Sequence, residues 1–202
     1  GQTIMQRAIE WAAGNGCDSL QSLLMLVVDG ANPTAQESSR RTLLESWCYV
    51  VSTISAAEPQ SSYDTFADNY DVVYVPSSVN YLDVANKLKL QPVGVVNEVS
   101  SLSAYLGFSS GTSGYNGTAT ELTDNTHYIT TGLPLGNLDI TTASTSLRTF
   151  VNTMAPGLHT LSTQPSATDP MIMTLDFGDE LLWGGNAPDR RVMLPWGGSS
   201  TF

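Results

Sequence analysis

The chain has 202 residues, of which 41% are hydrophobic and 13% charged, a length and composition that fit one globular domain with a sizeable core. Nineteen acidic and eight basic side chains give a formal net charge of −11, which argues against nucleic acid as a partner. No apolar run is long enough to cross a bilayer, so no membrane insertion is expected. Ser, Thr, Asn and Gly stand where a cytosolic surface has Lys and Glu, which indicates an extracellular or cell-surface location.

The first residues predict a helix within residues 1–16, with Gly14 and Gly16 as its stop signal. At the other end of the chain, residues 191–197 look like a strand that no helix follows. A parallel strand usually feeds a helix that packs back on its sheet. We therefore expect the opening helix to take the place of the helix missing after the last strand, as a permuted element. Its apolar stripe comprises Ile4, Met5, Ala8, Ile9, Ala12 and Ala13.

Apolar runs and amphipathic segments then alternate along residues 22–106. This alternation predicts a doubly wound α/β half with a parallel sheet. The expected strands cover residues 23–28, 50–55, 71–75 and 92–96, and the expected helices cover 33–49, 62–69 and 81–90.

Residues 107–202 read as a mixed, strand-rich half of the same single domain. A helical patch at 100–106 ends at Gly107, and a loop rich in Gly, Ser and Thr is expected up to about residue 120. Short strand-like runs separated by Gly and Pro should extend the sheet with antiparallel strands and add a small hairpin layer. These runs lie at 128–130, 138–142, 158–162, 171–176 and 191–194.

Two cysteines, Cys17 and Cys48, leave two interpretations open. Both could be free thiols, with Cys48 a small buried group on a helix. Alternatively, a disulfide could join the loop after the first helix to the next helix. Two cysteines alone cannot build a zinc site, and no motif for a metal or an organic cofactor is present.

Four segments carry a family resemblance: Asp-Val-Val-Tyr-Val at 71–75, Lys-Leu-Gln-Pro-Val-Gly-Val-Val-Asn at 89–97, Thr-His-Tyr-Ile-Thr-Thr-Gly-Leu at 126–133 and Arg-Arg-Val-Met-Leu-Pro-Trp at 190–196. They resemble the class I glutamine amidotransferase-like superfamily, nearest to its trehalose-utilisation (ThuA-like) branch and to related uncharacterised secreted bacterial domains. The resemblance implies a flavodoxin-like three-layer fold with a mainly parallel sheet. It also implies a terminal helix similar to residues 4–14.

The resemblance further implies where a catalytic cysteine should stand. Active amidotransferases carry it on a sharp turn after the strand that reads 92–96 here, and this chain has Asn97 and Glu98 at that turn. Glutamine hydrolysis is therefore not expected. The leading hypothesis is a non-catalytic binding or structural module of a larger bacterial secreted or surface protein, with neighbouring domains as partners. The alternative is an enzyme acting on a carbohydrate or related polar metabolite, with His127 and either Glu98 or Asp29 as its acid–base groups.

Polar residues at the ends of the parallel strands are the candidate site. Open α/β sheets bind ligands at the carboxyl ends of their strands. Capping of the following helices is the simpler alternative for these residue types. For His127, a structural hydrogen bond competes with a role as general base or metal ligand. If the pocket is functional, its ligand would be a carbohydrate or other polar molecule, and its residues would be Asp29, Ser77, Ser78, Asn97, Glu98 and His127.

Overall fold

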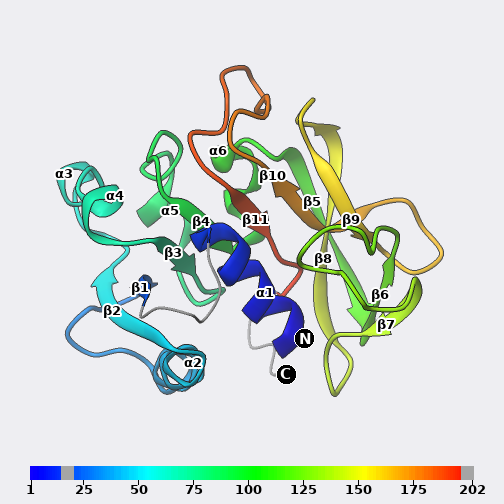
Figure 1. Cartoon of the computed structure of the whole chain (residues 1–202), viewed down its shortest axis with the longest axis horizontal. Helices are drawn as coiled ribbons and strands as arrows, with labels where there is room; N and C mark the ends of the chain where they lie inside the picture. Colours follow the sequence, from blue (N-terminus) through cyan, green and yellow to red (C-terminus); the bar gives the residue numbers. More distant parts are fainter. Residues whose placement is uncertain (15–20, 197–202) are drawn as a thin grey trace.

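The computed structural model describes residues 1–14 and 21–196. Its strands are β1 (Gln21–Val27), β2 (Tyr49–Ser55), β3 (Val72–Val75), β4 (Gly94–Asn97), β5 (Ser109–Gly117), β6 (Ala119–Leu122), β7 (Gly136–Asp139), β8 (Thr145–Met154), β9 (His159–Thr163), β10 (Pro170–Leu175) and β11 (Arg191–Met193). Within these residues, one large sheet has the order β2-β1-β3-β4-β11-β10-β9-β6-β7, and β5 pairs with β8 in a separate antiparallel sheet (Figure 1).

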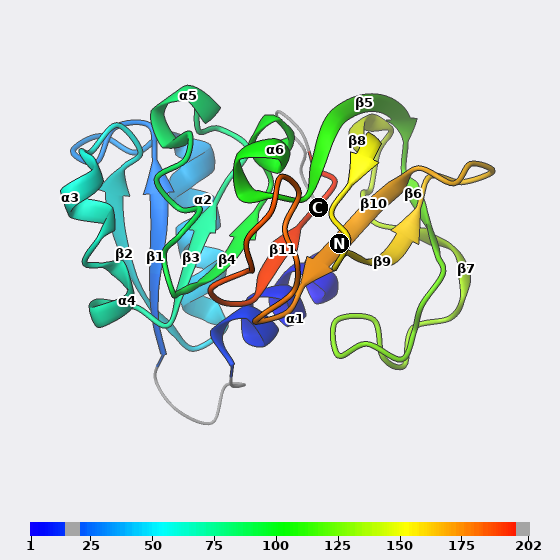
Figure 2. The same ribbon diagram turned by 90° about the horizontal axis from the view of Figure 1, so that it is seen from above.

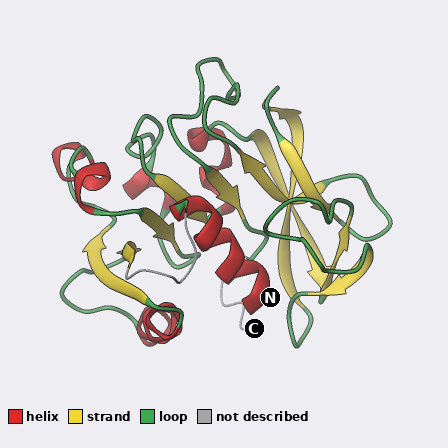
Figure 3. Cartoon of the chain, in the orientation of Figure 1, coloured by secondary structure: helices red, strands yellow, loops and turns green. Residues whose placement is uncertain are grey.

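Helices are few and mostly short in comparison with the strands (Figure 3). Two of them have twelve residues each, and the others make one turn. They are α1 (Gln2–Ala13), α2 (Ala35–Ser46), α3 (Gln60–Tyr63), α4 (Phe66–Asn69), α5 (Tyr81–Val84), the 3₁₀ helix η1 (Ser100–Leu102) and α6 (Ser103–Leu106). No helix in the described ranges combines the length and apolar character needed to cross a membrane.

The strand pairing in the large sheet changes once, from parallel to antiparallel, at β11. From β2 through β1, β3 and β4 to β11 all neighbours are parallel, and from β11 through β10, β9 and β6 to β7 all are antiparallel. Figure 2 shows the strands from β2 to β10 side by side in this order. The mixed α/β architecture, the parallel first half and the antiparallel second half confirm the sequence-based expectation at this level.

One face of the sheet is covered by α1 and α2. In Figure 1, α1 crosses over β4 and β11. Five of the six residues in its expected apolar stripe are buried, and Ala13 is half-buried. The helix approaches β4 so closely that a Cβ atom on Gly94 would lie 2.1 Å from the carbonyl oxygen of Ala12. The absence of a side chain at position 94 is therefore what lets α1 sit on the sheet.

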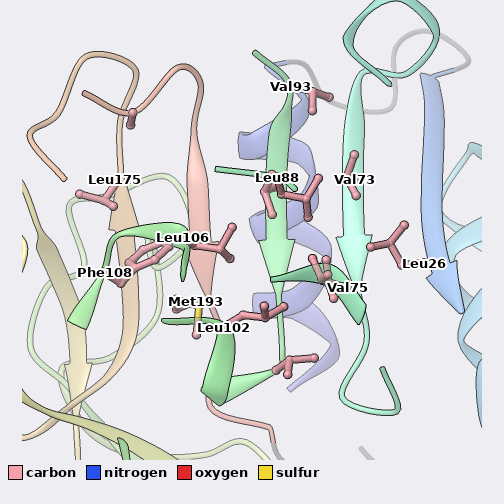
Figure 4. Close-up of a cluster of buried hydrophobic side chains, with 14 of the residues drawn as sticks. Leu26, Val73, Val75, Leu88, Val93, Leu102, Leu106, Phe108, Leu175 and Met193 are labelled. Atoms are coloured by element: carbon pink, nitrogen blue, oxygen red, sulfur yellow. The ribbon is translucent and has the colours of Figure 1, made fainter. Parts of the chain in front are cut away.

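The opposite face carries the short helices and a second apolar cluster (Figure 4). Arg191 is fully buried beside this cluster and has no carboxylate partner among the described residues. Its guanidinium instead donates to the carbonyl oxygens of Leu106 (3.0 Å), Leu88 (3.3 Å) and Lys89. Burial lowers the pKa of Arg191 to about 10. This arginine thus connects β11 with the end of α6 and with the turn at residues 88–89.

Four expectations about the elements were wrong. Residues 109–117, expected as a loop, form β5, because the ten-residue strand β8 supplies a hydrogen-bonded partner. Residues 128–130, expected as a strand, form a turn. The helix expected at 81–90 ends at Val84, because Ala85 takes a positive φ of 43°. Residues 62–69 form part of two separate turns of helix, α3 and α4.

Cys48 departs from the expectation of a buried thiol on a helix. It follows α2 in an exposed turn with a φ of 69°, and it is disulfide-bonded. The other cysteine of the chain, Cys17, lies outside the described residues. The disulfide interpretation is thus the one that holds for Cys48.

We expect Gly94→Ala to lower the free energy of unfolding by about 1–3 kcal/mol or more, because the new methyl group would push α1 off β4. Urea unfolding followed by circular dichroism measures this loss. The control is Gly114→Ala in β5, where a Cβ atom would meet its nearest neighbour at an ordinary 3.8 Å. Equal stability of the two variants would contradict the close contact between α1 and β4.

Candidate functional site

The carboxyl ends of β3 and β4 meet at one edge of the sheet, and a buried ion pair lies there. Glu98, directly after β4, is 1% exposed, and its Oε2 lies 3.5 Å from Nη2 of Arg40 on α2. Arg40 also donates to the sulfur of Met5 on α1 at 3.5 Å. The pair therefore connects the end of β4 with both helices that cover this face.

The loop after β3 closes over the same carboxylate. The backbone N–H of Ser77 donates to Glu98 Oε2 at 3.3 Å. Burial raises the pKa of Glu98 above its ordinary value, and the charge of Arg40 opposes that shift. The fully buried Tyr74 of β3 lies close by, and its pKa is raised by burial and by the charge of Glu98. Glu98 is thus held through Oε2, while its buried Oε1 has no hydrogen-bond partner in the part of the chain that the structure describes.

Asn97, at the turn where amidotransferases have their cysteine, serves the backbone. Its carboxamide nitrogen donates to the carbonyl oxygen of Val99 at 2.9 Å, and its carbonyl oxygen accepts from the Val99 N–H at 3.2 Å. The side chain is fully buried, with the sulfur of Met193 at 2.9 Å. These contacts fix the turn after β4 and hold the amide in the interior.

A second buried carboxylate, Glu37, organises the neighbouring loop. It completes a capping box with Thr34 at the start of α2, accepting from the Thr34 N–H at 2.8 Å. It also accepts from the Val28 N–H and from the Ser78 hydroxyl, both at 2.9 Å. Burial alone would raise the pKa of Glu37, but these hydrogen bonds outweigh it and lower the pKa. Ser78 therefore serves as a structural partner of α2.

Asp29 lies in the loop after β1 and is exposed. Its carboxylate accepts from the Ala31 N–H at 2.9 Å and from the side chain of Asn32 at 3.1 Å. The hydrogen bond from Asn32 is the main cause that lowers the pKa of Asp29. The residue forms an Asx turn, which matches the capping alternative better than a ligand contact.

A pocket of about 210 Å³ opens beside the ion pair. The loop after β3 contributes Ser77, Asn80 and Tyr81, and the segment after β4 contributes Glu98 and residues 99–101. Arg148 of β8 also lines the pocket. A smaller pocket of about 110 Å³ shares Ser100 and Ser101 and continues between α6 and β5. The edge thus presents serine hydroxyls, a tyrosine and a guanidinium to solvent.

His127 does not join this group, which corrects the expectation of one six-residue site. Its ring packs edge-on against Trp11 near the end of α1, with 4.9 Å between ring centroids. That end of α1 lies over Gly94, the first residue of β4, whereas Glu98 comes directly after the last residue of β4. His127 and Glu98 are therefore near opposite ends of this strand. Nδ1 of His127 accepts from the Ile129 N–H at 3.2 Å, and burial lowers the pKa of the ring. The structure thus shows for His127 a hydrogen bond of the kind that the structural alternative expects.

Three residues central to this edge were missed by sequence reasoning: Arg40, Glu37 and Arg148. The Thr-x-x-Glu spacing of residues 34–37 is a capping-box signal that could have identified Glu37. Arg40 and Arg148 reach the edge from 58 and 50 residues away in the chain, so no local pattern marks them.

Most of the residues that line the pocket are polar. Within residues 1–14 and 21–196, no cluster of His, Cys, Asp and Glu has the arrangement of a metal site. Asn97 is bonded to the backbone of Val99, and Glu98 lines the pocket with Oε2 paired to Arg40 and with a buried Oε1 that has no hydrogen-bond partner in the described ranges. Serine hydroxyls, Asn80, Tyr81 and Arg148 also line the pocket. Such groups orient and hold a polar ligand by hydrogen bonds.

Glu37→Gln should lower the free energy of unfolding by about 1–3 kcal/mol at neutral pH, because buried N–H groups would lose a charged acceptor. The folded-state pKa of Glu37 lies below its unfolded value, so its stabilisation is present at neutral pH and lost as pH falls. The gap between variant and wild type in urea unfolding should then shrink below the ordinary glutamate pKa of about 4.3. Glu45→Gln, at an exposed i,i+4 pair with Arg41, is the control and should change little. A gap for Glu37→Gln that does not vary with pH would contradict this assignment.

Arg40→Leu should cost about 3–5 kcal/mol at neutral pH, because it leaves the Glu98 carboxylate buried without its cation. The double variant Arg40→Leu, Glu98→Leu should recover most of that loss, since no uncompensated charge remains. Unfolding free energies of the two single variants and the double variant form the measurement. Additive losses would show that the two groups do not interact.

Comparison with known proteins does not assign the chain to a family. No protein-family model matches the sequence, and no curated protein matches it. The amidotransferase-like resemblance thus stays a prediction based on its four segments.

Proposed function

We propose that this chain is a non-catalytic, amidotransferase-like domain that binds a small polar ligand in the pocket after β3 and β4. The observation that carries the proposal is the state of the two residues at the nucleophile turn. Asn97 is buried and bonded to the backbone of Val99, and Glu98 is buried and paired with Arg40. A polar pocket nevertheless opens beside them. Because the side chains of the turn after β4 make structural contacts and a polar pocket remains beside it, the site is suited to binding.

The fold supports the amidotransferase-like part of the proposal. The order β2-β1-β3-β4-β11 is the order of flavodoxin-like sheets. α1 packs on β3, β4 and β11, where the helix returning from the last strand would lie. We therefore assign α1 to the place of the family's terminal helix, with permuted connectivity.

A secreted or surface location in a larger bacterial protein completes the proposal. The disulfide at Cys48 is the kind of bond that persists in oxidising compartments. The acidic surface, poor in lysine, fits the same setting. Neighbouring domains of the same protein are then its natural partners.

One observation favours the enzymatic alternative, a hydrolase or related enzyme of carbohydrates. Glu98 borders the pocket, and burial raises its pKa, which is a property of carboxyl groups that act as general acids. Such an enzyme would need a second acid–base group in reach of the ligand. His127, the partner suggested by the sequence, lies at the other end of β4.

Binding without turnover is the expected result. Small sugars and hydroxylated acids at millimolar concentration should shift the NMR amide signals of residues 77–81 and 98–101, while the ligand remains chemically unchanged. His127→Ala should bind as the wild type does. Ligand consumption that depends on Glu98 would favour the enzyme instead, and shifts confined to other parts of the chain would refute the pocket.

A glutamine-analogue electrophile tests the inactive turn independently. Mass spectrometry of the oxidised protein after incubation should show no adduct, because Asn97 stands at the nucleophile position and Cys48 is in a disulfide. A stoichiometric adduct would refute the non-catalytic assignment.

A further inference from the structure

We infer that the pocket selects a polyhydroxylated ligand that carries an acidic group, and that Arg148 binds this group. The inference rests on the proposed binding function and names its ligand class. It follows from the position of Arg148, from the charge balance of the pocket and from the hydroxyl groups around it.

Arg148 reaches the pocket from the small sheet. It lies on β8 opposite Gly114 of β5, and its Nη1 would be 3.8 Å from a Cβ atom at that position. On the same strand, Leu147 and Thr149 are buried, and Arg148 is half-buried. The backbone N–H of Arg148 donates to the carbonyl oxygen of Pro195 at 2.7 Å, which fixes the strand at this residue. Arg148 therefore lines the pocket from a strand whose backbone is hydrogen-bonded on both sides.

The guanidinium of Arg148 makes no hydrogen bond or ion pair with any residue in the described ranges. Other arginines of the chain are engaged. Arg41 and Arg190 lie against carboxylates, and Arg191 donates to backbone carbonyl oxygens. Arg148 thus lines the pocket with donors that no described residue engages.

The charge balance of the pocket is positive although the whole chain is acidic. Of the described residues that line it, Glu98 is the sole carboxylate, and Arg40 offsets its charge. Among residues 1–14 and 21–196, no carboxylate pairs with Arg148. An anionic group is its complement, and a guanidinium binds carboxylate or sulfate oxygens through two parallel hydrogen bonds.

The remaining lining groups suit hydroxyls. Ser100, Ser101, Asn80 and Tyr81 offer donors and acceptors around the pocket. Its volume of about 210 Å³ is below the 300–1,000 Å³ or so of pockets for drug-sized molecules. One acidic sugar unit matches this combination of size, hydroxyl groups and charge.

Isothermal titration with glucuronate and glucose tests the inference, because the two sugars differ in a carboxylate at one carbon. Glucuronate should bind with a Kd about tenfold lower than that of glucose, since charge-assisted hydrogen bonds are stronger than neutral ones. Arg148→Gln should abolish this difference. Arg41→Gln removes the same charge from an exposed pair on α2 and should leave the difference intact. Thermal unfolding of both variants verifies that they are folded.

The other outcomes are distinct. Equal affinity for the two sugars, with NMR shifts in the pocket, would overturn the acidic-group inference and leave the proposed binding function standing. Absence of glucuronate binding would overturn the inference, and the wider ligand screen would then decide the binding function. Inorganic sulfate that binds as tightly as glucuronate and displaces it would show that the pocket takes a bare oxyanion, which would overturn the polyhydroxylated part.

Discussion

The parallel strands carry apolar side chains on both faces, so the sheet can exist in water only where a second layer covers each face. Every residue of β3 and β4 is buried. α1 and α2 form the layer on one face, and the short helices with the loop before β11 form the other. This covering also positions the loops at the carboxyl ends of the strands. The pocket thus depends on the same packing that keeps the sheet out of water.

Two buried arginines connect these layers to the sheet by different physical means. Arg40 balances the charge of Glu98 and belongs to the layer of α1 and α2. Arg191 lies on the opposite side and is stabilised by the carbonyl dipoles of Leu106, Leu88 and Lys89. The chain has eight basic residues, and the charges of these two arginines stabilise the fold. Arg148 differs from them because its charge faces a pocket.

The sequence predicted those features that depend on local pattern. The apolar run at β1 and the alternation that follows it indicated the parallel half, and the stripe on α1 indicated its buried face. Residues 109–117 were not recognisable as a strand, because Gly and Ser have low strand propensity and the order of β5 comes from its pairing with β8. Strand ends correctly placed Ser77 and Glu98 at one edge. Their partners Arg40 and Arg148 come from distant segments, so sequence spacing could not reveal them.

The walls of the pocket belong to two separate sheets. Its hydroxyl groups follow strands of the large sheet, and Arg148 stands on β8, which pairs with β5 in the small sheet and is joined to the segment after β11 by the bridge between Leu147 and Trp196. A ligand that contacts both walls therefore acts as a bridge between them. If ligand binding stabilises the position of β8, then a displacement of β8 must weaken ligand binding by the same free energy, because coupling between two sites is reciprocal. The β5–β8 sheet is thereby a point from which a contact elsewhere on the protein could control occupancy of the pocket.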